Sequence, residues 1–151
     1  LAGNMLYLWI FGDNIEDRLG HIGYLVFYLA GGVAAALLQV VISPSSGIPM
    51  VGASGAIAAI LGAYLVMYPN SRVYTFVPIG YFARLTLMPA IVVLGLWFLL
   101  QILSGVGSLG ALNEGGTAYF AHIGGFIFGL VGGWLFKKRG REPQPAPPSW
   151  S

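Results

Sequence analysis

The stretches Gly52-Ala53-Ser54-Gly55 and Ala121-His122-Ile123-Gly124-Gly125 each stand at the start of a long hydrophobic run. Each run is long enough to enter a lipid bilayer, whose hydrocarbon core needs about 20 apolar residues in a helix. A serine and a histidine, each near the start of such a helix, are the minimal parts of a hydroxyl nucleophile and its base. The two stretches therefore predict a helical membrane protein that carries a reactive serine.

The composition agrees with that interpretation. Hydrophobic residues make up 57% of the chain and charged residues only 8%, and the mean hydropathy is +0.80. Soluble domains carry about 25% charged residues, so this is predicted to be an integral membrane protein. We expect one all-α, polytopic domain over residues 1–139 and a proline-rich disordered tail at 140–151. Its helices are expected at residues 1–11, 22–42, 51–67, 87–103 and 118–136.

The start of the sequence indicates missing material. The first expected helix ends at residue 11, and the chain begins at Leu1 without an initiator methionine. We therefore expect these residues to be the C-terminal part of a longer protein. The chain has no cysteine, which excludes both a disulfide framework and a zinc site built on thiolates.

The basic residues predict the orientation in the membrane. If the expected helices alternate in direction, all seven basic residues fall on one side: Arg18, Arg72, Arg84, Lys137, Lys138, Arg139 and Arg141. Lysine and arginine accumulate on the cytoplasmic side of membrane proteins. We therefore expect the C-terminus inside and the connections at residues 43–50 and 104–117 outside.

In this topology three polar side chains from three helices reach the same depth, near the outer surface. They are Asn4, Ser54 and His122. A polar group in hydrocarbon costs free energy unless it is paired, so such residues usually face a bundle interior and are functional candidates. Serine alone often bonds its own helix, and asparagine alone often joins two helices. His122 is the only histidine in the apolar segments, because His21 lies beside Arg18 on the basic side.

Two rows of small residues favour close packing of the serine and histidine helices. The rows are Gly125, Gly129 and Gly133 on the face of His122, and Ser54, Ala58 and Gly62 at a spacing of four. Small residues let membrane helices approach closely. We therefore expect the two helices to come near enough for the serine to reach the imidazole.

Three motifs together resemble the rhomboid intramembrane serine proteases. They are Gly-Asn-Met-Leu-Tyr-Leu-Trp-Ile-Phe-Gly-Asp-Asn-Ile-Glu-Asp at 3–17, the Gly52-Ala53-Ser54-Gly55 stretch, and Ala-His-Ile-Gly-Gly-Phe at 121–126. The likeness covers residues 1–139, and residues 68–80 look like the family's cytoplasmic loop between its fourth and fifth helices. The resemblance implies a six-helix core of which this chain supplies helices two to six. The first helix and the loop after it would lie upstream of Leu1.

The resemblance also implies roles for individual residues. Ser54 matches the family's nucleophile, and His122 matches the histidine that takes its proton, with no acidic third member. Asn4 matches an asparagine that stabilises the oxyanion together with the backbone N–H of the serine. The histidine of the family's His-x-x-x-Asn pattern would directly precede Leu1. By analogy with the family, the helix at 87–103, which carries Trp97 and Phe98, and the glycine-rich connection at 104–117 would move to admit the substrate.

One position departs from the family pattern. Many members have an aromatic residue one turn after the serine, where it stacks on the histidine, and here that position is Ala58. We expect Phe126 or a neighbouring aromatic residue to take its place.

The expected function is hydrolysis of a peptide bond in or near a transmembrane segment, by a serine endopeptidase with a Ser54–His122 dyad and no cofactor or metal. The alternative is a non-catalytic rhomboid-like protein that binds membrane clients, although such proteins have lost the serine or the histidine. A transporter is disfavoured because no charged residue falls inside the expected helices, and a metalloprotease because no His-Glu-x-x-His exists. The expected partners are the bilayer and transmembrane substrates, with no nucleic acid. The expected location is a bacterial cell membrane, with the active site toward the outer face. Substrate identity and oligomeric state stay open.

Overall fold

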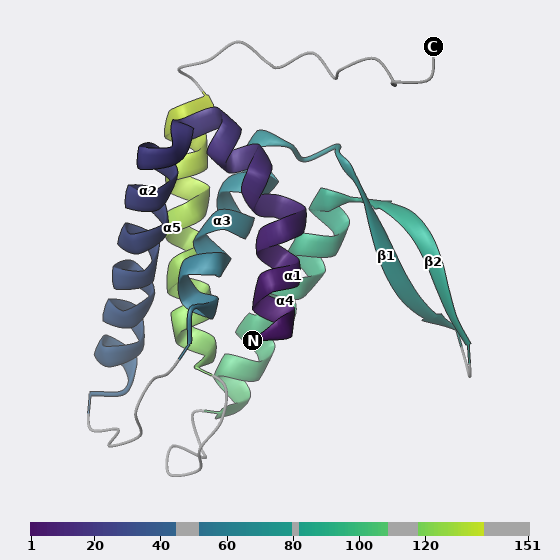
Figure 1. The fold of residues 1–151 in the computed structure, drawn as a ribbon. Helices are drawn as coiled ribbons and strands as arrows, with labels where there is room; N and C mark the ends of the chain where they lie inside the picture. The colour runs from purple at the N-terminus through teal and green to yellow at the C-terminus, as the bar shows by residue number, and fades with distance from the viewer. Residues whose placement is uncertain (45–51, 80–81, 109–117, 138–151) are drawn as a thin grey trace.

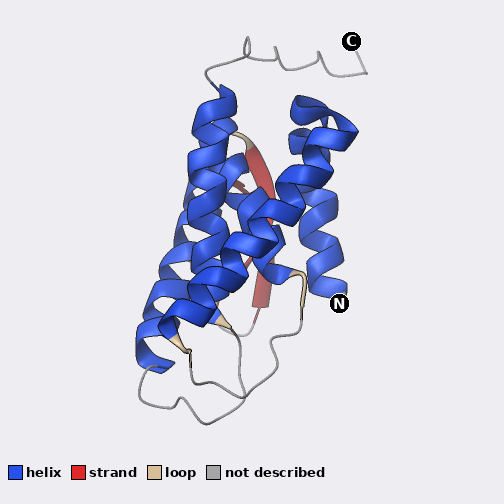
Figure 2. Cartoon of the chain, turned by 90° about the vertical axis from the view of Figure 1, so that its left-hand side faces the viewer, coloured by secondary structure: helices blue, strands red, loops and turns tan. Residues whose placement is uncertain are grey.

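A computed structural model describes residues 1–44, 52–79, 82–108 and 118–137 of the chain. The described elements are a bundle of helices and one hairpin of two strands (Figures 1 and 2). In chain order they are α1 (Ala2–Tyr7), the π-helix η1 (Leu8–Gly12), α2 (Asp13–Ile42), α3 (Ser54–Met67), β1 (Arg72–Ile79), β2 (Phe82–Pro89), α4 (Ala90–Ser108) and α5 (Tyr119–Lys137).

Helix α3 is the centre of the bundle. It contacts α5, α2, α4 and η1, and every residue from Gly55 to Tyr64 is buried. A helix that is apolar on all sides is stable only when other helices cover it completely. The outward faces of α2 and α4, in contrast, expose many large apolar side chains. The bundle therefore has a protein core around α3 and an apolar outer surface, as a protein surrounded by lipid requires.

Residues 2–42 form a helical stretch that reverses its direction at one glycine. It passes from α1 through η1 into α2, and Figure 1 shows the chain rising along α1 and descending along α2. The reversal occurs at Gly20, whose φ of 71° and ψ of 162° are not helical. That backbone conformation is almost restricted to glycine, because a Cβ would clash there. The expected connection between residues 11 and 22 is thus mainly helical.

Among the described residues, three helical stretches are long and apolar enough to cross a membrane: Ala2–Ile42, Ala90–Ser108 and Tyr119–Lys137. The shorter apolar helix α3 lies between them. The predicted class, a helical polytopic membrane protein, is confirmed. The expected tail at 140–151 and most of the two expected outside connections fall beyond the described residues.

The hairpin is the element that was not predicted from the sequence. Strands β1 and β2 pair antiparallel, with Thr75 opposite Thr86. The sequence of β1 is rich in β-branched and aromatic residues, which suit a pleated strand. The amide of Ala90 donates to the carbonyl of Ser71 at 2.7 Å and closes the base of the hairpin. Because Leu87 pairs in β2, helix α4 begins at Ala90 and not at residue 87 as expected.

Candidate active site

Ser54 is the first residue of α3, and a turn of unusual backbone precedes it. Gly52 has a φ of 141°, a value that residues with a side chain rarely adopt. The first backbone hydrogen bond of the helix runs from the amide of Ile57 to the carbonyl of Ala53 at 3.0 Å. The amide N–H groups of Ser54 and the next two residues therefore have no partner within the helix. They give this end of α3 a partial positive charge.

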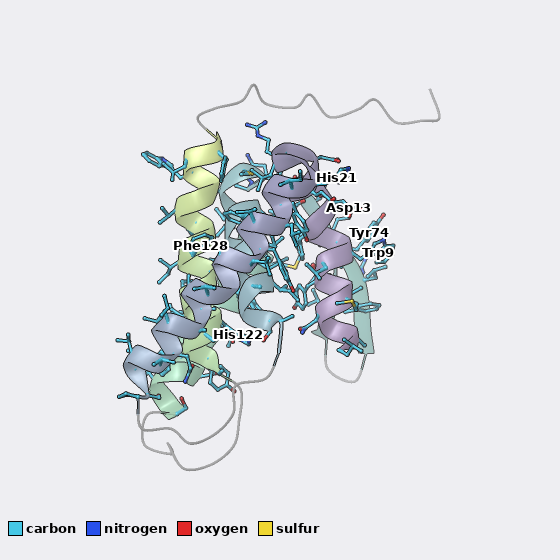
Figure 3. All side chains as sticks on the ribbon, turned by 60° about the vertical axis from the view of Figure 1, so that its left-hand side comes forward. Trp9, Asp13, His21, Tyr74, His122 and Phe128 are labelled. Atoms are coloured by element: carbon cyan, nitrogen blue, oxygen red, sulfur yellow. The ribbon has the colours of Figure 1, made fainter. Side chains whose placement is uncertain are left out.

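His122 lies in the first turn of α5, directly beside Ser54. Its Nε2 atom is 2.8 Å from the Oγ atom of Ser54, a normal hydrogen-bond distance. The histidine is only 9% exposed, and Ser54 is half-buried. Figure 3 shows His122 at the end of the bundle opposite Asp13 and His21. We call the end that holds Ser54 and His122 the dyad end.

Glycines bring α3 and α5 into backbone contact. A Cβ placed on Gly125 would lie 2.0 Å from the carbonyl oxygen of Gly55, and one placed on Gly129 would lie 2.0 Å from that of Ala59. Ordinary van der Waals contact begins at 3.4 Å. The contacts advance in the same direction along both helices, so α3 and α5 pack in parallel with their first turns side by side. This spacing is what lets a short serine side chain reach the imidazole.

The same packing explains the alanine at position 58. Ala58 is fully buried, and its Cβ lies 3.3 Å from the Cβ position of Gly125. A large ring at this position would meet the backbone of α5 and force the helices apart. The close approach of α3 and α5 therefore suits a small side chain here.

An aromatic ring reaches His122 from α4. The indole of Trp97 has its centroid 5.9 Å from that of the imidazole, at an interplanar angle of 34°. Trp97 also contacts Phe126, which stacks on Phe98 with centroids 4.3 Å apart. The ring beside the histidine is thus Trp97, whereas Phe126 supports it from behind.

Two glutamines at the dyad end were not predicted from the sequence. The Oε1 atom of Gln101, on α4, lies 2.8 Å from the Nδ1 atom of His122. The Oε1 atom of Gln39, on α2, accepts a hydrogen bond of 3.1 Å from the amide of Ala121 and so satisfies an unpaired donor at the start of α5. Both glutamines interrupt apolar runs, which is the pattern that singled out His122. An uncharged amide is simply less conspicuous there than a histidine.

Asn4 is not joined to this pair. It lies on α1, which contacts α3, and its side chain is partly exposed. Within the described ranges, no hydrogen bond connects Asn4 to Ser54 or to His122. The structure thus brings two of the three predicted polar residues together.

The opposite end of the bundle is held by other polar contacts. The Nζ atom of Lys137 donates to the carbonyl of Val66 at 3.0 Å, near the C-terminus of α3, where a positive charge is favourable. The hydroxyl of Tyr68 donates to the carbonyl of Asn14 at 3.2 Å. These contacts fix the far ends of the helices that carry the dyad.

The geometry at the dyad end suits nucleophilic chemistry. A serine hydroxyl becomes a useful nucleophile only when a base within hydrogen-bond distance accepts its proton. His122 lies at that distance, and its other ring nitrogen is held by Gln101. The free amide groups at the start of α3 can stabilise a negative charge beside the serine. No cluster of side chains suited to a metal ion occurs among the described residues.

Comparison with known proteins identifies the family. Residues 1–139 match the rhomboid domain. The chain belongs to the rhomboid family. It is 29% identical over 145 residues to the mitochondrial Rhomboid protein 1 of Saccharomyces cerevisiae, a match that covers 91% of this chain and 38% of that protein. It is 33% identical over 143 residues to the Rhomboid protease GluP of Bacillus subtilis, covering 92% of this chain and 25% of GluP.

A human relative extends the comparison. The mitochondrial presenilin-associated rhomboid-like protein of Homo sapiens is 29% identical over 136 residues, which is 86% of this chain and 32% of that protein. No solved structure shows a significant match. This rhomboid domain therefore spans between a quarter and two fifths of the length of these three relatives.

Family membership supports a protease-like function within the membrane. The apolar helices and the relatives identify a membrane protein. The relatives come from mitochondria as well as from a bacterium, so they do not support the expected assignment to a bacterial cell membrane.

Proposed function

We propose that this chain carries the catalytic centre of a rhomboid-type serine endopeptidase that cleaves membrane proteins in or near a transmembrane segment. The observation that carries the proposal is the 2.8 Å contact between the Oγ atom of Ser54 and the Nε2 atom of His122. The two residues come from separate helices, and glycine packing holds those helices at the distance that the contact needs. A small packing serine would need neither a histidine partner nor this spacing.

In the proposed reaction, the Oγ atom of Ser54 attacks the carbonyl carbon of the scissile peptide bond while His122 accepts the hydroxyl proton. His122 then gives this proton to the leaving amine, and water hydrolyses the acyl-enzyme in a second step. General acid–base catalysis of this kind contributes typically about 10²–10⁴-fold to the rate.

The negative charge on the tetrahedral oxygen needs hydrogen-bond donors. The backbone N–H of Ser54 is one proposed donor, because it has no partner within α3. The side chain of Asn4 is the second, on the strength of its match to the family motif. Each donor of an oxyanion hole is worth roughly 2.7–4 kcal/mol of transition-state stabilisation.

The proposed substrates are transmembrane proteins, and the proposed orientation places the C-terminus in the cytoplasm or its equivalent. Three of the four basic residues in the described part support it: Arg18 and Arg72 lie near the ends of helices away from the dyad, and Lys137 bonds the C-terminal end of α3. The fourth, Arg84, lies in β2 of the hairpin, opposite Val77. The dyad end would then face the outer side. A polar site close to one surface has access to the water that hydrolysis requires.

The proposal is tested by cleavage of a transmembrane reporter in liposomes. The wild-type protein should cleave it, and Ser54→Ala should lose cleavage while its thermal unfolding stays unchanged. If the wild-type protein cleaves the reporter and Ser54→Ala does not, the alternative of a non-catalytic client-binding protein is dismissed. A wild-type protein that binds the reporter but never cleaves it would favour that alternative.

A further inference from the structure

The structure places a third polar side chain in line with Ser54 and His122. We propose that Gln101 is a positioning residue that holds the imidazole of His122 in the one tautomer able to accept the serine proton. The proposal rests on the proposed function, because a tautomer matters only if His122 acts as a base. It adds a member to a site that the family resemblance describes as a dyad.

The atoms in contact determine where the ring proton lies. Gln101 presents its carbonyl oxygen, Oε1, to the Nδ1 atom of His122 at 2.8 Å. A carbonyl oxygen can accept a hydrogen bond but cannot donate one, so the proton in this contact belongs to Nδ1. A neutral imidazole carries only one ring proton. The Nε2 atom therefore presents its lone pair to the hydroxyl of Ser54, 2.8 Å away.

The opposite tautomer would disable the site. With the proton on Nε2, the imidazole could donate to Ser54 but could not take its proton. The Nδ1 atom would then face the oxygen of Gln101 with lone pair against lone pair. Gln101 disfavours this arrangement, as the second partner of a functional histidine commonly does.

No charged group competes for this role in the described part of the chain. The acidic side chains described there are Asp13, Glu16 and Asp17, all at the start of α2, at the end of the bundle opposite the dyad (Figure 3). A carboxylate beside His122 would be costly to bury among apolar helices. An amide supplies the same acceptor oxygen without a charge, and this suits a site within a membrane.

Helix α4 fixes the imidazole in two directions. Gln101 forms a hydrogen bond with the Nδ1 atom of His122, and Trp97, one turn earlier on α4, packs beside the imidazole ring. Ala58 leaves no aromatic side chain on α3 for the second task. The same helix therefore supplies both supports, and its position determines the direction of the Nε2 lone pair.

The test compares two variants of Gln101. Gln101→Met keeps the length of the side chain and its packing but removes the acceptor. We expect kcat for the liposome reporter to fall about 10- to 100-fold, the range known for hydrogen-bond partners that orient metal-binding histidines, with KM nearly unchanged. Gln101→Glu keeps an acceptor oxygen and should recover part of the loss. Gln101→Met should stay folded but unfold at a somewhat lower temperature, because the buried Nδ1 atom of His122 loses its partner, so kcat is compared well below the unfolding transition of both proteins.

A spectroscopic measurement tests the tautomer independently of activity. Within residues 1–151, His21→Asn leaves His122 as the single histidine, and His21 is 93% exposed and remote from the dyad. The ¹⁵N shifts of labelled His122 should report a protonated Nδ1 in the otherwise wild-type protein. In Gln101→Met the Nε2-protonated form should appear.

The outcomes separate this proposal from the function on which it rests. If Ser54→Ala is inactive while Gln101→Met matches wild type in kcat and in its ¹⁵N shifts, the role of Gln101 is wrong and the protease stands. A wild-type protein that carries its proton on Nε2 would also exclude the proposed role of Gln101. If Ser54→Ala cleaves as fast as wild type, the proposed function fails and the role of Gln101 fails with it.

Discussion

The substitution Gly129→Ala tests whether close packing of α3 and α5 builds the dyad. Gly129 lies two turns beyond His122 and does not touch Ser54, so its effect on the dyad must pass through the helix spacing. The new Cβ would lie 2.0 Å from the carbonyl oxygen of Ala59 and 2.9 Å from the Cα atom of that residue. Both contacts are with backbone, which cannot rotate out of the way.

The magnitude follows from these distances. To reach ordinary contact at 3.4 Å, the helices must separate locally by more than 1 Å. Overpacking of a tight interface costs typically 1–3 kcal/mol, and we expect a loss of stability near the upper end, about 3 kcal/mol. A similar displacement at the dyad would lengthen the 2.8 Å contact beyond about 3.5 Å, where a hydrogen bond is lost.

The assay combines thermal unfolding in detergent with the rate at which a fluorophosphonate labels the protein. Gly129→Ala should unfold at a lower temperature and be labelled at least about tenfold more slowly, because the base is worth about 10²–10⁴-fold. Gly95→Ala is the matched control: a Cβ on Gly95 meets nothing within 4 Å, and alanine favours a helix over glycine by about 1 kcal/mol. If Gly129→Ala matches Gly95→Ala in both measurements, the packing argument is wrong. If it loses stability but labels at the wild-type rate, the dyad does not depend on the spacing.

Three other features lead to separate predictions. Gln39→Leu removes the acceptor for the amide of Ala121, so it should lower the free energy of unfolding by about 1–3 kcal/mol and slow fluorophosphonate labelling. Unchanged stability and an unchanged labelling rate would show that the contact is dispensable. Cysteines at Thr75 and Thr86 should form a disulfide on mild oxidation, because these residues lie opposite each other in the hairpin. A cysteine pair shifted by one residue should not form a disulfide, and equal cross-linking of both pairs would overturn the register. A single cysteine at Ser43 should react with an impermeant maleimide from the outer side, and one at Ser71 only after permeabilisation; the reverse pattern would overturn the proposed orientation.

The sequence alone predicted the helical class and the pairing of Ser54 with His122 for one reason. Polar residues are rare in apolar helices, so each of them stands out against its surroundings. The glycine rows could also be read directly, because spacing of three and four residues defines a helix face. These inferences depend on local patterns that the linear sequence displays.

The remaining features depend on tertiary structure. The hairpin was hidden because residues 68–80 resemble a connecting loop in the sequence, and pairing between two strands is a long-range property. The contact between Gln101 and His122 was hidden because sequence spacing does not give the rotation of α4 relative to α5. The sequence also suggested a connection around Gly20. It did not show that the chain stays helical on both sides of this glycine.

Mass spectrometric mapping of the fluorophosphonate adduct tests the central claim most directly. The claim is that His122 activates the hydroxyl of Ser54. We predict one modified residue, Ser54, in the wild-type protein, no adduct in Ser54→Ala, and a labelling rate lower by about 10²-fold or more in His122→Ala. An adduct on another serine, or labelling of His122→Ala at the wild-type rate, would contradict the account.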